Sequence, residues 1–172
     1  MNRVIFGVNQ AFDKVILKPV TFAYRSLTPD FFRKGVSNFL HNLKSPVILV
    51  NDILQGEIGR AGDTVARFVI NSTVGIFGLV DVAENLGFEQ HNEDFGQTLA
   101  VWGFGEGPYL MLPILGPSNP RDAIGRVVDF FVDPINWWVA PDDNRIPIIR
   151  TAVSAIDLRD RLWENLEEID KN

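Results

Sequence analysis

The sequence of 172 residues contains no cysteine and only two histidines. Without cysteine, thiol catalysis, disulfides and cysteine-ligated metal sites are excluded. Basic residues are also in deficit, because 16 Lys and Arg stand against 22 Asp and Glu, which gives a net charge of −6. No basic stripe is available to neutralise phosphates, so nucleic acid is excluded as the main partner. The length suits a single domain over residues 1–172.

Long uninterrupted apolar runs are missing as well. The start of the chain shows no charged region followed by an apolar signal-peptide core, so either the protein is cytosolic or its export signal has been removed. The least charged stretch, residues 95–120, exceeds the roughly 20 residues that a membrane-crossing helix needs. Repeated glycines and prolines interrupt it between 103 and 117. We therefore expect no ordinary transmembrane helix, only short apolar segments separated by turns.

The spacing of apolar residues predicts a protein that is almost entirely helical. Thr28 is the predicted N-cap of the second helix, with Pro29 at its first position, and Ser45-Pro46 is the predicted start of the third. Strand signals are weak, because the short apolar runs 47–50 and 109–112 have no hairpin partner with turn chemistry. The predicted helices cover residues 2–17, 29–43, 46–55, 60–73, 94–102, 119–132 and 147–169. We expect one all-α domain.

Candidates for catalysis are few. Only His41 and His91 could act as general bases near neutral pH without a large pKa shift. The carboxylates of Glu93 and Asp94 could orient the His91 imidazole. The alternative, which we favour, is a solvated loop with Asp94 as the N-cap of the next helix, because no serine lies in a G-x-S-x-G elbow. We expect His41 to be a half-buried or surface histidine on a helix, and the protein not to be an enzyme.

Phosphate-binding and metal-binding motifs are also weak. The glycine-rich run 103–108 contains Glu106 and Pro108 and is followed by no lysine, so we interpret it as a close-packing bend and not as a nucleotide loop. Asp129 and Asp133 lie one helical turn apart and could bind a metal, but no established metal motif surrounds them. We expect neither a metal nor another resident cofactor.

Aromatic residues are concentrated in the apolar middle of the chain, residues 65–140. Tryptophan and tyrosine are enriched where an apolar phase meets lipid headgroups, because their rings are amphipathic. Core packing is the alternative for any one of them, but two adjacent tryptophans point in different directions on a helix and are hard to bury together. We therefore predict a membrane or partner interface at Trp102, Phe104, Tyr109, Phe130, Phe131, Trp137 and Trp138.

Polar side chains also interrupt apolar helix faces. Asn71 and Ser72 lie among apolar neighbours, and Asn38 and Asn42 do the same on an earlier helix, beside Phe39. Buried amides require hydrogen-bond partners. They either tie helix ends together, which we favour for Asn71, or provide a polar lining for the passage of a lipid headgroup.

An ordered series of motifs resembles the MlaA (VacJ) family of bacterial outer-membrane lipoproteins over most of the chain. No single motif is specific, but the complete series in this order is. The series consists of Asn9 with Asp13, Leu17-Lys18-Pro19, Asn38-Phe39, Asn42-Leu43, Pro46, Asn51, Leu54-Gln55-Gly56, Arg67-Phe68, Asn71-Ser72-Thr73, Gly75, Gly78, Asp81-Val82-Ala83, Glu93-Asp94-Phe95-Gly96-Gln97-Thr98-Leu99, Gly103, Gly107-Pro108-Tyr109, Leu112-Pro113, Gly116-Pro117 and Arg121-Asp122.

The resemblance implies an all-α, ring-shaped domain of interfacial helices around a central amphipathic channel, in the periplasmic leaflet of the outer membrane. It implies removal of mislocalised outer-leaflet phospholipids, their transfer to a soluble periplasmic carrier of the MlaC type, association with a trimeric porin, and no catalysis. The residues expected to line the lipid path are Asn38, Phe39, Asn42, Asn71 and Ser72. The alternative is a structural scaffold that binds porins without lipid passage.

Two features of the family are missing from this sequence. The signal peptide and the lipidated cysteine are absent, so we expect the natural full-length protein to be lipid-anchored and to have been cut just before this start. We also expect a C-terminal tail beyond the last helix.

Overall fold

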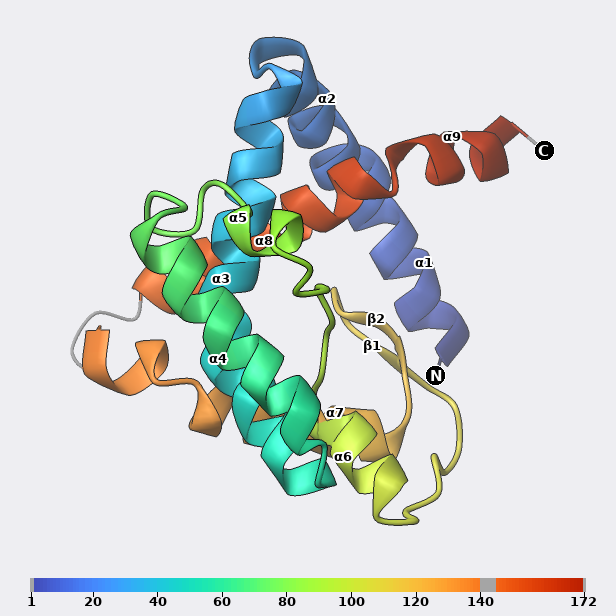
Figure 1. The fold of residues 1–172 in the computed structure, drawn as a ribbon. Coiled ribbons are helices and arrows are strands. Elements are labelled where there is room, and N and C mark those ends of the chain that lie inside the picture. Colours follow the sequence, from blue (N-terminus) through green and yellow to red (C-terminus); the bar gives the residue numbers. More distant parts are fainter. Residues whose placement is uncertain (1, 140–144, 172) are drawn as a thin grey trace.

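A computed structural model describes residues 2–139 and 145–171, without the side chains of 138, 139 and 169–171. Helices dominate it, as the apolar spacing predicts (Figure 1). The elements are α1 (Asn2–Phe12), the π-helical η1 (Asp13–Leu17), α2 (Lys18–Leu27), α3 (Asp30–Gln55), α4 (Ile58–Thr73), α5 (Val82–Asn85), α6 (Phe95–Val101), β1 (Leu110–Leu112), β2 (Gly116–Ser118), α7 (Pro120–Val132), the π-helical η2 (Ile135–Val139), α8 (Arg145–Arg161) and α9 (Trp163–Lys171).

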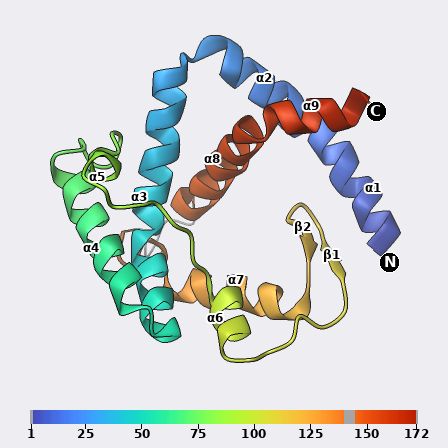
Figure 2. The same ribbon diagram turned by 45° about the vertical axis from the view of Figure 1, so that its right-hand side comes forward.

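These elements follow one another around a ring (Figure 2). Helices α1 and α2 form one side, α3 with α4 the next, and α6 with α7 the third, while the β1–β2 hairpin returns to α1. The side chain of Asn9 closes the ring, because its Nδ2 donates to Leu112 O at 2.9 Å and its Oδ1 accepts from Ile114 N at 2.7 Å. The all-α, ring-shaped architecture that the resemblance implies is therefore present.

Helix α8 lies between α2 and α3 and contacts both (Figure 2). Its carboxyl-terminal half is fixed by ion pairs. The guanidinium of Arg159, which is buried, donates to both carboxylate oxygens of Asp13 at 2.6 and 3.0 Å. Asp160 accepts from Arg25 at 2.7 Å. These bonds hold α8 at a fixed position inside the ring.

Several helix boundaries differ from the sequence prediction, which also places no helix over α2 or α5. Thr28 is not the N-cap of α3, because its hydroxyl bonds back to Tyr24 O and Pro29 occupies the cap position. Ser45-Pro46 does not start a helix, because α3 continues through Pro46. The buried residues on both sides of Pro46, including Ser45 and Val47, lie in the helix that packs against α4, and this packing outweighs the lost backbone hydrogen bond. The last predicted helix is broken at Leu162 into α8 and α9.

The prediction that residues 109–112 have no strand partner is wrong. Leu110–Leu112 pairs antiparallel with Gly116–Ser118. The turn between them places Ile114 at φ 66°, a conformation that β-branched residues rarely adopt. The turn therefore lacks the usual sequence signature and could not be recognised from residue types.

The partition of polar and apolar side chains is inverted. Among the described residues, the buried apolar side chains are only Val47, Ile48, Ala61, Ala83 and Met111, whereas buried polar and charged side chains are more numerous. Large apolar side chains are exposed along nearly every helix. So many exposed large apolar side chains indicate contact with a partner or a membrane. Across the described segments, no helix combines the length and the apolar character that crossing a membrane requires.

Candidate functional site

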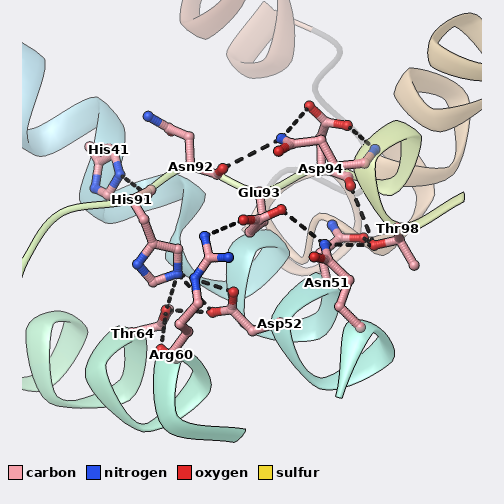
Figure 3. Close-up of polar contacts among 12 residues, drawn as sticks. His41, Asn51, Asp52, Arg60, Thr64, His91, Asn92, Glu93, Asp94 and Thr98 are labelled. Atoms are coloured by element: carbon pink, nitrogen blue, oxygen red, sulfur yellow. Dashed lines mark hydrogen bonds and ion pairs between the residues drawn. The ribbon is translucent and has the colours of Figure 1, made fainter. Parts of the chain in front are cut away.

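Polar side chains fill the junction where α3, α4 and the segment after α5 meet (Figure 3). Asp52, which is fully buried, accepts from His91 Nε2 at 3.0 Å and from the Thr64 hydroxyl at 2.7 Å. Buried charges persist only when such partners satisfy them. This set of bonds fixes the spacing of α3 and α4 and holds the following segment against both.

A second set of bonds continues from Glu93, which is 3% exposed. Its carboxylate accepts from Gln55 at 2.9 Å and pairs with Arg60. Gln55 also donates to the hydroxyl of Thr98 at 3.1 Å, and Thr98 donates to Asn51 Oδ1 at 2.8 Å (Figure 3). The favoured prediction of a solvated loop around His91 is therefore wrong at Glu93, since this carboxylate is buried and Gln55 of α3 and Arg60 of α4 supply its partners. The predicted N-cap role of Asp94 is confirmed, because its side chain accepts from Gln97 N.

The His91 environment does not form a catalytic triad. In a triad the imidazole bonds a carboxylate through one ring nitrogen and the nucleophile through the other. Here Asp52 and Thr64 both contact Nε2, and neither of the expected orienting carboxylates is a partner of the ring. The adjoining cavity measures about 10 Å³, which is too small for a substrate.

His41 bonds the same junction, since its Nε2 donates to His91 O at 3.0 Å. Burial lowers the pKa of His41, and the charges of Arg67 and Lys44 lower it further against the opposing effect of the His91 bond. Because the folded-state pKa lies below the unfolded value of about 6.5, the unfolded state binds more protons, and stability falls as the pH drops through that value.

His41→Gln keeps a donor for this bond and removes the titration. We expect the variant to lose less thermal stability than the wild type between about pH 7.5 and pH 5. Melting temperatures measured at intervals across this range provide the check. Parallel curves for the two proteins would contradict the assignment.

Four of the five predicted lipid-path residues lie in hydrogen bonds between segments. Asn38 donates to Leu79 O at 3.2 Å, and Asn42 donates to the Ser72 hydroxyl at 2.9 Å. Asn71 donates to Asp81 and accepts from the backbone N–H of Ala83, which ties α4 to α5. Phe39, the fifth, lines an apolar pocket between α3 and α8.

Four pockets adjoin α8, two of them with an apolar lining. We call the first the α2-side pocket, which has a volume of about 520 Å³ and an almost entirely apolar lining. It is lined by Phe12, Ile16, Leu17, Val20, Ile114, Phe130, Pro147, Ile148, Thr151, Ala152, Ala155 and Ile156. We call the second the α3-side pocket, of about 510 Å³, lined by Val36, Phe39, Leu40, Leu43, Ile135, Ile146, Ile149, Arg150 and Val153.

Two further pockets adjoin the same helix, and we name them polar after the charged and polar residues among their lining. The central polar pocket, of about 280 Å³, is lined by Lys44, Val47, Arg126, Asp129, Phe130, Asp133, Asn136, Pro147, Arg150, Thr151 and Ser154. The distal polar pocket, of about 190 Å³, is lined by Ser37, Leu40, His41, Lys44, Gln90, Asn92, Ser154, Asp157 and Arg161. Shared lining residues show that the α2-side, central and distal pockets adjoin one another in a row along α8.

Asp129 connects the buried junction to the central polar pocket. It accepts from Asn51 Nδ2 at 3.0 Å and from Phe95 N at 3.2 Å. Burial raises the pKa of Asp129, although these two hydrogen bonds act in the opposite direction. The other carboxylate that could have bound a metal, Asp133, pairs with Arg150. Within the described residues no group of three potential metal ligands is present.

The predicted aromatic interface residues are exposed wherever their side chains are described. Trp102 donates its indole N–H to Leu54 O at 3.0 Å. Trp137 stacks on Phe131 with ring centroids 5.7 Å apart, and Phe130 meets Phe131 edge to face. Phe104 and Tyr109 lie on the segment between α6 and β1. The side chain of Trp138 lies outside the described residues.

The pocket residues of α8 escaped the sequence analysis, although a signal for them exists. Ile148, Ala152 and Ala155 follow one helical face, and Ile149 with Val153 follows another. Two apolar faces on one helix predict apolar surroundings on both sides of it.

Comparison with known proteins places the chain in a family. The model of the family described as MlaA lipoprotein matches residues 1–172. An intermembrane phospholipid transport system lipoprotein, MlaA, of Escherichia coli K12 is 35% identical over 81% of this chain, and an uncharacterized protein of Rickettsia typhi is 37% identical over 82%. This chain spans 57% of the length of each of these curated relatives.

A solved structure from work on the "Structural basis for maintenance of bacterial outer membrane lipid asymmetry" superposes on the ring with a TM-score of 0.83. It shares 31% sequence identity, and the match covers 99% of this chain and 86% of that one. The chain therefore belongs to the MlaA lipoprotein family.

Proposed function

We propose that this chain forms a single domain that conducts phospholipids out of the outer leaflet of the outer membrane and so maintains lipid asymmetry. The observation that carries the proposal is the row of adjoining pockets along α8, which begins with an apolar lining and ends with a polar one. A phospholipid likewise has apolar acyl tails and a polar headgroup. The apolar end of the row therefore suits its tails, and the polar end suits its headgroup. Two relatives support this choice, because the E. coli protein is a lipoprotein of an intermembrane phospholipid transport system and the solved structure comes from work on the maintenance of outer-membrane lipid asymmetry.

The inverted surface supports a membrane location. Apolar side chains exposed along the helices gain free energy in contact with lipid, and buried hydrogen bonds between the helices satisfy the polar groups. We propose that Trp102, Phe104, Tyr109, Phe130, Phe131, Trp137 and Trp138 contribute to the interface with headgroups. The periplasmic leaflet of the outer membrane, a trimeric porin and a soluble periplasmic lipid carrier are the proposed surroundings.

The lipid path is proposed to follow the pockets along α8, with Phe39 at the α3-side pocket. The hydrogen bonds of Asn38, Asn42, Asn71 and Ser72 favour a role in holding α3, α4 and α5 together beside that path. We also predict that these four residues contact passing lipid. Replacing each with alanine and measuring surface-exposed phospholipid tests this prediction.

Blocking the row provides the main test. Ser154 lines both the central and the distal polar pockets, so Ser154→Trp fills the space between them. In cells that lack their own family member, surface-exposed phospholipid should be raised, and expression of this protein should lower it again. We expect Ser154→Trp to lose most of this effect.

Leu158→Trp is the matched control, because Leu158 lies on the same helix, is 52% exposed and lines none of these four pockets. It should act like the wild type. If Ser154→Trp is made at normal levels, binds a trimeric porin and still restores asymmetry, the path along α8 is wrong. If the unmodified protein binds porin but never lowers surface phospholipid, a scaffold is the better description.

A further inference from the structure

Helix α8 separates two apolar pockets of nearly equal size. The α2-side pocket measures about 520 Å³ and the α3-side pocket about 510 Å³. Ile148, Ala152 and Ala155 face the first, whereas Ile149 and Val153 face the second. Both volumes fall in the range of about 300–1,000 Å³ that is usual for small-molecule sites.

The central polar pocket adjoins both apolar pockets. It shares Phe130, Pro147 and Thr151 with the α2-side pocket and Arg150 with the α3-side pocket. The central polar pocket therefore lies where the α2-side and α3-side pockets approach each other, near the amino-terminal half of α8.

The charges of the central polar pocket suit an anion. Its carboxylates are already engaged, since Asp133 pairs with Arg150 and Asp129 accepts from Asn51 and Phe95 N. Two further cations, Lys44 and Arg126, also line it; within the described part of the chain neither makes a hydrogen bond or ion pair, and Lys44 acts on Asp129 only through its charge. In a chain with a net charge of −6, this local excess of cations is distinctive. Arginine and lysine are the usual partners of phosphate groups.

We propose that one two-chain glycerophospholipid sits astride α8, with one acyl chain in each apolar pocket and its phosphate beside Lys44 and Arg126. This proposal rests on the function proposed above and adds a selectivity to it. A lipid with one chain fills only one of the two apolar pockets, so the site prefers two-chain phospholipids to their one-chain counterparts. A two-chain lipid that lacks a phosphate gains nothing from the cations.

The test measures the equilibrium binding of lipids to the purified, delipidated chain in detergent, with native mass spectrometry as the readout. The probes are dioleoylphosphatidylethanolamine, its one-chain lyso form and dioleoylglycerol. We expect the two-chain phospholipid to bind at least about tenfold more tightly than the lyso form, because the second chain buries many methylene groups.

Two variants fill one pocket each. Ala155→Trp obstructs the α2-side pocket and Val153→Trp the α3-side pocket. Each should weaken two-chain binding about tenfold and leave lyso binding within about twofold, since the lyso chain can use the open side. Leu158→Trp should change neither. Lys44→Gln combined with Arg126→Gln should weaken both phospholipids and leave dioleoylglycerol unchanged.

A crosslinking measurement on the wild-type protein tests the same proposal without relying on variants that must fold. A phosphatidylethanolamine with a photoreactive group on both chains should crosslink to residues of both apolar pockets, identified by peptide mass spectrometry.

Equal affinities of the wild type for the one-chain and two-chain phospholipids, or crosslinks confined to one side of α8, would overturn the two-chain site while leaving lipid transport intact. No binding of any phospholipid would instead count against the proposed function itself.

Discussion

Replacing Gly125 with alanine should lower the melting temperature by about 6–12 °C, from a destabilisation of about 3 kcal/mol. Gly125 lies in α7 where this helix crosses α6. A Cβ at this position would lie 2.3 Å from Gly96 N and 2.7 Å from Gly96 Cα. Both neighbours are backbone atoms, which cannot move aside as a flexible side chain could, so the two helices would have to separate. Thermal unfolding followed by circular dichroism measures the effect.

Gly62→Ala is the matched control for this substitution. Gly62 lies within α4, is exposed, and a Cβ there would meet no atom within 4 Å. Alanine favours a helix interior over glycine by about 0.5–1 kcal/mol, so this variant should melt at the same or a slightly higher temperature. If Gly125→Ala behaved like Gly62→Ala, the close crossing of α6 and α7 would be incorrect.

Replacing Asp81 with asparagine should destabilise the protein by about 3–5 kcal/mol, because it removes the counter-ion of a buried guanidinium. The side chains of Arg67 and Asp81 are only 5% and 9% exposed, and they form an ion pair. Asp81 also accepts from Asn71 Nδ2 at 2.9 Å and from Glu84 N at 3.2 Å. These bonds join α4 to the start of α5, so we expect the segment after α4 to become sensitive to proteases as well.

The pH dependence of this effect follows from the pKa of Asp81. Burial acts to raise this pKa, but the hydrogen bonds from Asn71, Arg67 and Glu84 outweigh burial and lower it. A lowered folded-state pKa adds stability above the unfolded value of about 3.9, and this stability is lost as the pH falls through the folded pKa. The difference between wild type and Asp81→Asn should therefore be full near neutral pH and should shrink in acid.

An ion pair whose carboxylate is exposed, and whose arginine keeps Asp160 as a second partner, provides the comparison for the buried one. Asp30, 83% exposed, pairs with Arg33, and such pairs contribute only about 0–1 kcal/mol. Asp30→Asn should thus barely shift the melting temperature. Equal losses for Asp30→Asn and Asp81→Asn would show that the burial of the Arg67–Asp81 pair is not what makes it important.

Local signals predicted most of the helices correctly. Asn119 caps α7 at the predicted position, and Gly56 ends α3 in the left-handed conformation that glycine favours. Local signals failed where tertiary packing competes with them. Pro46 has the preferences of a helix start, yet the packing of α3 on α4 carries the helix through it. Ile114 occupies a left-handed turn position that its own residue type disfavours, so the hairpin was missed.

The candidate site was the least predictable part. The sequence identified polar side chains inside apolar segments, but it could not say which of them would find partners. Asn42 and Ser72 lie 30 positions apart and become hydrogen-bonded neighbours only because α3 packs on α4. Lys44 and Arg126 look like ordinary surface cations in the sequence, and they come to line one pocket only in the folded ring.

The sequence by itself determined the helical character, the lack of a long apolar span and the motif series of the MlaA lipoprotein family, because these depend on local preferences and on residue order. Only the tertiary structure decided that α8 lies between two apolar pockets with a cation-rich pocket beside them. The physical reason is that the pockets are spaces between helices far apart in the chain, and their shape and charge follow from the buried ion pairs and hydrogen bonds that set the distances between those helices.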